Sequence, residues 1–421
     1  MEETDRISKL PESIIHHILS YLNSPKDLVR MSILSNYWFG LTASFPIFNF
    51  NFLKFMEVLE SSGIPLDTED QMDFFLKYVQ YTISRFCEQN VSVHTFNITT
   101  SFCDPTEVAI IDKCIGLILE KGVKELVIDI PNWTYGYGLQ YPHMYHVPNI
   151  FLSASSLTSL TLCYCEIPSS FMVDAVKFKS LKLLHLKSVR LNEEVITSFT
   201  TSCPLLEEFI VIYCYGLKRF WVYGHLNLRQ VEIQFRPEID RIDIDAPNLC
   251  FLCLYDFNSE RGAPPSMNLA SCKKLTKVCY HGEGLVDLSH NFPFLEDLFL
   301  NLPKKCKRLT LSSHSLRTIM LNSECDLGNI DLNAPNLLLF GFTDNLHFHS
   351  PMGSFSIPSK PCMEWDREDF VEDNWFEMLR QILDKKLRFK ELKLHINVVL
   401  YRPTFDSSFI VLYIISSNEI K

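Results

Sequence analysis

The chain has 421 residues, 47% hydrophobic and 21% charged, which suits one large domain or two to three smaller ones and excludes bulk disorder. Its net charge of −11 argues against a general nucleic-acid-binding protein, which would need a basic face. No apolar run approaches the about 20 residues that span a bilayer, and residues 1–8 do not form a signal peptide. We therefore expect no nucleic-acid or membrane partner, reduced cysteines, and a location in the nucleus, the cytoplasm or both.

The first fifty residues predict three short helices. Pro11 suits the first position of a helix, because its missing N–H would have no acceptor there. Ser24 is expected to begin a second helix, and Ser35 to cap a third that carries Trp38. Three helices of this size cannot bury all their apolar side chains among themselves. Part of that surface should face a partner, unless it packs only on the rest of the chain. The stripe of the first helix consists of Ile14, Ile15, Ile18, Leu19 and Leu22.

Residues 5–38, DRISKLPESIIHHILSYLNSPKDLVRMSILSNYW, open with the pattern D-R-I-S-x-L-P. This segment resembles the F-box, in particular its plant form. The resemblance implies that the segment binds the Skp-type adaptor of a Skp–cullin–F-box ubiquitin ligase. One departure is Asn36-Tyr37, where the family usually has two basic residues, and we expect it to weaken adaptor binding or shift adaptor preference. The implied adaptor-facing or motif-core residues are Leu10, Pro11, Ile14, Ile18, Leu22, Val29, Leu34 and Trp38.

The middle of the chain first predicts helices and then a repeat. Apolar periodicity indicates helices over residues 52–60, 69–87 and 106–122. The pattern L-x-x-L-x-L, with other apolar residues allowed, predicts one short strand per copy, and stacked copies share a core. From the copy at Leu157 to the copy at Leu337, successive copies start 20 to 26 residues apart. This period is typical of leucine-rich repeats, and it disfavours the alternative of a plain β-sandwich. The copies start at Val93, Val123, Leu157, Leu181, Leu206, Leu228, Leu249, Leu275, Leu295, Leu316, Leu337 and Phe389.

These segments predict an α/β fold with a three-helix F-box followed by an irregular leucine-rich-repeat solenoid. We expect a curved parallel sheet with short helices or loops on its outer face. The predicted boundaries are an F-box over 5–50, a helical connector packing on the solenoid over 51–90, repeats over 91–400 and a C-terminal extension over 401–421. The whole chain resembles plant F-box/leucine-rich-repeat proteins of the FBD-associated type, with no clear FBD region.

The sequence was also compared with the motifs of catalytic, metal-binding and cofactor-binding sites. The sequence lacks the motifs of serine hydrolases, phosphate loops, dinucleotide folds and HExxH metalloproteases, so we predict a non-enzymatic chain without metal or cofactor. Cys165 and Cys214 occupy the position that satisfies backbone groups at the turn in the repeat family. The C-x-x-C of Cys250 and Cys253 is expected to hold buried structural thiols within a strand. His16 and His17 are expected to be solvated or packing residues.

Two segments of the chain carry runs of like charge. Residues 304–308 are basic and residues 364–377 are acidic. We expect a solvated edge of the solenoid at the first segment. The second is expected to be an insertion or the start of a helix. A contact with a charged partner is the alternative at both.

The interpretation is a substrate-recognition subunit of a Skp–cullin–F-box ubiquitin ligase. The F-box would bind the adaptor and, through it, a cullin-RING ligase, and the repeats would hold a target protein. Neither the target nor its contact residues follow from the sequence. One alternative is an interaction scaffold that acts outside ubiquitin transfer. A small-molecule receptor is disfavoured, because successive repeats lack a matching cluster of Arg and Lys.

Overall fold

The computed structural model describes residues 7–19, 21, 30–61, 68–88, 92–101, 105–131, 144–167, 178–235, 239–256, 265–281, 293–302, 308–323, 329–343, 363–367, 392–398 and 410–416. The chain divides into two compact units. Unit 1 comprises Met1–Leu206 and Cys214–Gly216, and unit 2 comprises Glu207–Tyr213 and Leu217–Lys421. Among the described helices, none has the length and apolar character needed to cross a membrane.

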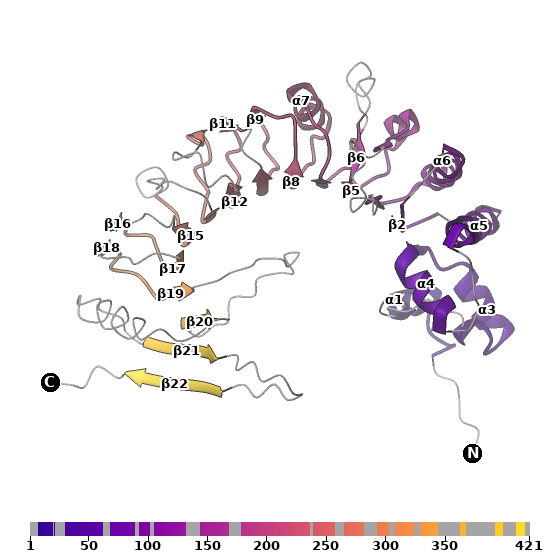
Figure 1. The fold of residues 1–421 in the computed structure, drawn as a ribbon, viewed down its shortest axis with the longest axis horizontal. Helices are drawn as coiled ribbons and strands as arrows, with labels where there is room; N and C mark the ends of the chain where they lie inside the picture. The colour runs from indigo at the N-terminus through magenta and orange to yellow at the C-terminus, as the bar shows by residue number, and fades with distance from the viewer. Residues whose placement is uncertain are drawn as a thin grey trace. The chain divides into compact units, whose positions relative to one another are not determined.

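Unit 1 begins with α1 (Glu12–Leu19) and α3 (Asn36–Ala43) (Figure 1). The predicted start of α3 is confirmed, because Ser35 has extended backbone and its hydroxyl accepts a hydrogen bond from the Trp38 amide at 3.2 Å. Helix α1 starts at Glu12, one residue after the first position predicted at Pro11. Residues 30–32 are helical, and the rest of the helix expected from Ser24 lies outside the described residues.

The helices predicted downstream are also confirmed. They are α4 (Phe52–Ser61), α5 (Thr68–Cys87) and α6 (Pro105–Glu120); the structure also contains α7 (Glu193–Ser202) and a short 3-10 helix at Asn149–Ser153. Helix α6 ends two residues before the predicted position 122. Gly122 lies there at φ +70°, a left-handed conformation that terminates helices. In Figure 1 α5 and α6 lie on one side of the strands that follow them in the chain.

The strands of unit 1 form a parallel sheet in the order β1 (Ile47–Asn51), β2 (Thr95–Thr99), β3 (Glu125–Asp129), β5 (Ser159–Cys163) and β7 (Leu183–Lys187). Neighbouring repeats are in register, so Phe96, Leu126 and Leu160 lie side by side and are fully buried. Alternate side chains point to the other face, as the period of two requires. The predicted strand of each repeat copy in this unit is therefore confirmed. Two short strands, β4 (Tyr145–His146) and β6 (Cys165–Glu166), pair with each other in parallel as a separate two-stranded sheet.

Unit 2 repeats the same construction. Its main strands follow the order β8 (Glu208–Cys214), β10 (Gln230–Phe235), β12 (Phe251–Asp256), β14 (Lys277–His281), β15 (Asp297–Leu302), β17 (Thr318–Ser323) and β19 (Leu339–Thr343). Their inward residues, such as Leu252 and Leu298, are fully buried. Farther along the chain, β20 (Met363–Arg367) pairs parallel with β21 (Leu392–Val398), which pairs antiparallel with β22 (Ile410–Ser416). Apart from residues 363–367, the acidic segment lies outside the described residues, as does the basic segment apart from Arg308.

Two features differ from the expected outline. Short parallel strands, rather than only helices or loops, occupy the stretches between main strands: β9 (Arg219–Val222), β11 (Arg241–Ile244) and β13 (Ser266–Asn268) form one sheet, and β16 (Arg308–Ser312) and β18 (Asn329–Asn333) another. The repeat sheet also starts at β1, well before residue 91. The reason is that Phe45, Phe48 and Phe50 have the same spacing as the later copies, and all three are buried.

Candidate functional site

Helix α1 carries two apolar lines that have different surroundings. Ile15 and Leu19 point inward and are almost fully buried in a cluster with Trp38, Leu41 and Phe45. The α1 stripe, defined here as Leu10 just before the helix and Ile14 and Ile18 on it, is spaced by four residues along a neighbouring side and is 36–46% exposed. The helix therefore contributes to the core with one line and offers the other to solvent.

The predicted site residues divide in the same way. Pro11 is exposed beside the α1 stripe, and Leu34, just before α3, is 65% exposed. Trp38 is only 6% exposed, so it occupies a core position of the helical segment. Leu22 and Val29 lie outside the described residues. The structure thus places Leu10, Pro11, Ile14, Ile18 and Leu34 at the surface; their role in binding an adaptor stays a prediction.

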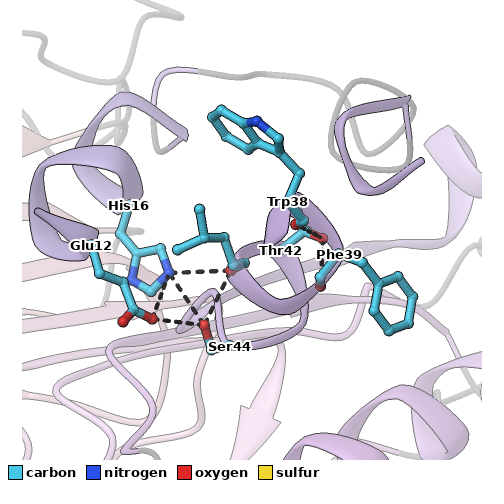
Figure 2. Close-up of polar contacts among 7 residues, drawn as sticks. Glu12, His16, Trp38, Phe39, Thr42 and Ser44 are labelled. Carbon is cyan, nitrogen blue, oxygen red and sulfur yellow. Dashed lines mark hydrogen bonds and ion pairs between the residues drawn. The ribbon is translucent and has the colours of Figure 1, made fainter. Parts of the chain in front are cut away.

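A small polar network holds α1 against the end of α3 (Figure 2). The Ser44 hydroxyl lies 3.0 Å from the Glu12 carboxylate and 3.2 Å from the Leu41 carbonyl. The His16 Nε2 atom lies 3.1 Å from that same carbonyl, and its ring packs edge-on against Phe45 at 5.7 Å. Of the two roles expected for His16, solvated or packing, the structure shows the packing one, against Phe45. The network fixes the orientation of α1 and hence the direction in which its stripe points.

Three exposed apolar side chains near α3 were not assigned to the site from the sequence. Ile33 is 78% exposed, and Tyr37 and Phe39 are each nearly half exposed. The Arg85 guanidinium of α5 lies 5.2 Å from the centre of the Phe39 ring, within range of a cation–π interaction. The departure at Asn36-Tyr37 was the available signal, since it puts an aromatic ring where the resemblance leads one to expect a charge.

The face of the unit 1 sheet that points away from the core is polar. Asn97, Val127, Thr161 and His185 form one row across four strands. Burial, reinforced by the nearby Lys187, lowers the pKa of His185 to about 4, so the imidazole is neutral at physiological pH. Within the described residues the buried atoms Asn97 Oδ1 and His185 Nε2 have no hydrogen-bond partner. The same is true of Asp129 Oδ1 in the next row.

Thiols at the turns behave as the sequence predicts. The Cys165 Sγ atom donates to the Cys163 carbonyl at 3.2 Å, and Cys214 Sγ to the Leu186 carbonyl at 3.4 Å. Burial raises the pKa of Cys165 well above its ordinary value, which keeps the thiol protonated and able to donate. The expectation for the C-x-x-C holds only for Cys253. Cys250 precedes β12 and is exposed.

Metal ligands were also examined. In the described ranges, no group of three or more His, Cys, Asp or Glu side chains is arranged to hold a metal ion.

Two family models match the chain. The F-box-like model matches residues 7–47, which include α1, α3 and the start of β1. A model described as "FBD-associated F-box protein At5g56370, LRR repeats" matches residues 111–291. Both matches are consistent with the plant F-box/leucine-rich-repeat family.

The proteins that this chain is similar to include several from Arabidopsis thaliana. It is 23% identical over 328 residues to the putative F-box/LRR-repeat protein At5g02930, and the aligned region covers 76% of this chain and 62% of that protein. It is 24% identical to F-box/LRR-repeat protein 25 over 60% of this chain and 86% of that protein. It is 29% identical to the F-box/FBD/LRR-repeat protein At1g13570 over 50% of this chain and 45% of that protein. The chain thus spans less than two thirds of the first and third of these relatives.

Proposed function

We propose that this chain is the substrate-recognition subunit of a Skp–cullin–F-box ubiquitin ligase. The observation that carries the proposal is the α1 stripe. Helix α1 buries Ile15 and Leu19 while leaving Ile14 and Ile18 at the surface, and Leu10 just before the helix is exposed as well. A helix that exposes an apolar line next to a complete core has a surface suited to a protein partner. The F-box-like match over residues 7–47 supports a Skp-type adaptor as that partner.

Magnitudes are consistent with this assignment. Burying one Leu or Ile side chain contributes about 1.5–3 kcal/mol. The α1 stripe and Leu34 are already partly covered, so each contributes toward the lower end of that range. The exposed Ile33 and Tyr37 enlarge the surface. Together these anchors contribute a free energy of the same order as the association cost of about 4–15 kcal/mol.

The repeats would hold the target. Their parallel sheet presents a face on which side chains from neighbouring repeats lie in registered rows. Catalysis would then arise from proximity, because the chain holds a target lysine near a ubiquitin-charged enzyme supplied by a cullin-RING ligase. The chain itself would supply position rather than a bond-making group. Such a complex would work in the nucleus, the cytoplasm or both.

The test is adaptor co-purification by the double variant Leu10→Ala/Pro11→Ala and by Ile14→Ala/Ile18→Ala. We expect each to lose adaptor binding, because each removes exposed apolar groups without touching the buried cluster. The matched control is Leu226→Ala, a 65% exposed leucine of unit 2, which should bind the adaptor normally. Undiminished binding by both double variants would contradict the interface.

A scaffold that acts outside ubiquitin transfer is the second candidate. It is favoured by Asn36-Tyr37, which gives α3 an aromatic rather than a basic start. Cullin co-precipitation separates the two functions. The ligase subunit brings down adaptor and cullin together, whereas the scaffold brings down the adaptor without the cullin.

A further inference from the structure

Two cysteines of unit 2 face each other on adjacent strands. Cys253 of β12 and Cys279 of β14 are direct partners in the parallel register. Each alternates with buried core residues, Leu252 and Leu254 on one strand and Val278 and Tyr280 on the other. The two thiols therefore stand side by side on the sheet face that points away from the core.

Their immediate contacts set this pair apart from the turn cysteines. Cys165, Cys214 and Cys272 each donate to a backbone carbonyl. The thiols of Cys253 and Cys279 instead hydrogen-bond to one another, and this bond lowers the pKa of Cys279 and raises that of Cys253. Cys279 also lies 3.9 Å from the Tyr255 hydroxyl. Cys253 is fully buried, whereas Cys279 is partly exposed and provides access to the pair.

The strand geometry favours a bridging ion over a disulfide. Neighbouring strands of a sheet lie about 4.8 Å apart in the hydrogen-bonding direction. A disulfide needs Cβ atoms about 3.5–4.5 Å apart, so it would have to pull β12 and β14 together. An ion with metal–sulfur bonds of about 2.3 Å accommodates two sulfurs up to roughly 4.6 Å apart without moving either strand.

The number of ligands narrows the class of ion. Glu232 of β10 is the registered neighbour of Cys253, but Gln234 donates to its carboxylate at 2.7 Å. No third metal-binding side chain joins the two thiols among the residues that the structure describes. Zn²⁺ in structural sites requires four ligands, whereas soft thiolates select Cu⁺. A pair of thiolates is a complete ligand set for a linear two-coordinate ion.

We propose that Cys253 and Cys279 form a two-thiolate site for a thiophilic monovalent ion of the Cu⁺ class. Binding forms two metal–sulfur bonds and releases the two thiol protons to solvent, with no change of oxidation state. The ion links two successive repeats on the face that lies opposite the core. The site is independent of the F-box and of the proposed ligase function.

The experiment titrates the full-length, fully reduced chain with Cu⁺ in competition with a chromophoric Cu⁺ chelator. We expect Cys253→Ser and Cys279→Ser each to lose the same tightly bound ion, and the double variant to lose no more than either. Cys250→Ser is the matched control, since Cys250 is an exposed cysteine of the same unit, and it should keep the full stoichiometry. Thermal melts establish that the serine variants are folded.

A second measurement needs no variant. Mass-spectrometric mapping of the Cu⁺ adduct on the wild-type chain should place the ion on the peptides that contain Cys253 and Cys279. Unchanged stoichiometry in both serine variants would overturn the proposal. So would an ion mapped to other cysteines, or complete conversion of the pair to a disulfide by diamide, since that would show the strands do approach closely enough for a direct sulfur–sulfur bond.

Discussion

Helix α1 and the repeat strands treat the same kind of residue in opposite ways. In the strands, the apolar positions of each copy are buried, as Leu160 and Leu184 illustrate at 0% exposure. In α1, half of the apolar positions remain at the surface although a complete core lies beneath them. Apolar residues in the repeats therefore stabilise the fold, whereas those of the α1 stripe are available for association. Substitutions in the two regions should separate stability from binding.

The largest effect is expected in the repeats. Leu160→Ala in β5 removes a fully buried side chain and leaves a cavity, so the free energy of unfolding should fall by about 2–5 kcal/mol. Ile14→Ala in the α1 stripe should change it by less than about 1 kcal/mol. Urea unfolding monitored by circular dichroism measures both. Equal losses would show that the α1 stripe is structural.

Glycines should also respond differently in the two regions. Gly216 has φ +89°, and a Cβ atom there would lie 2.5 Å from the Leu191 carbonyl oxygen. Gly216→Ala should therefore destabilise the chain by at least about 1–3 kcal/mol. Gly40 in α3 has nothing within 4 Å of such an atom, so Gly40→Ala should stabilise the helix by about 0.5–1 kcal/mol. Thermal melts should move in opposite directions, and a shift of the same sign would contradict the geometry.

The cap of α3 should matter less than the repeat core. Ser35→Ala removes the hydroxyl that accepts from the Trp38 amide and should cost about 1 kcal/mol. Ser35→Asp keeps an acceptor at the same place and serves as the control. Chemical unfolding of the two variants gives the comparison, and an equal loss in both would show that the hydroxyl is not acting as a cap.

The smallest effect concerns acid. The folded pKa of His185 is about 4, below its ordinary value of 6.5, so in this pH range the unfolded chain binds a proton that the folded chain does not. The stability linked to this group is complete above pH 6.5 and declines as the pH falls toward 4. His185→Gln should therefore lose less stability than the wild type between pH 7 and pH 4.5. Parallel slopes in urea unfolding would show that His185 is not desolvated.

Spacing made most of the fold predictable. A repeat of 20 to 26 residues with fixed apolar positions determines where each strand falls, and the strands were found there. The cap at Ser35 and the turn thiols Cys165 and Cys214 were predictable because their partners lie nearby in the chain or at the same point of each repeat. Strand β1 was missed because Phe48 and Phe50 fall within the predicted F-box boundary of residues 5–50.

The candidate sites were less predictable. That Trp38 is in the core while Leu34 is at the surface depends on how α1 and α3 cross, which periodicity alone does not give. The pairing of Cys253 with Cys279 depends on the 26 residues between the two repeat starts Leu249 and Leu275 and on the resulting register. A shift of one residue would put one thiol on the opposite face.

The position of Phe45 and Ile47 has a consequence for how the protein is divided in the laboratory. Phe45 belongs to the helical cluster and Ile47 packs against it, yet Ile47 already pairs with β2 as part of β1. The F-box helices thus act as the terminal cap of the repeat array and shield its edge strand, the part of a sheet most prone to pair with other molecules. A repeat fragment that starts after Asn51 would expose β2 as a new edge and tend to aggregate. A fragment used to study target binding should therefore keep the helices, even where adaptor binding is not wanted.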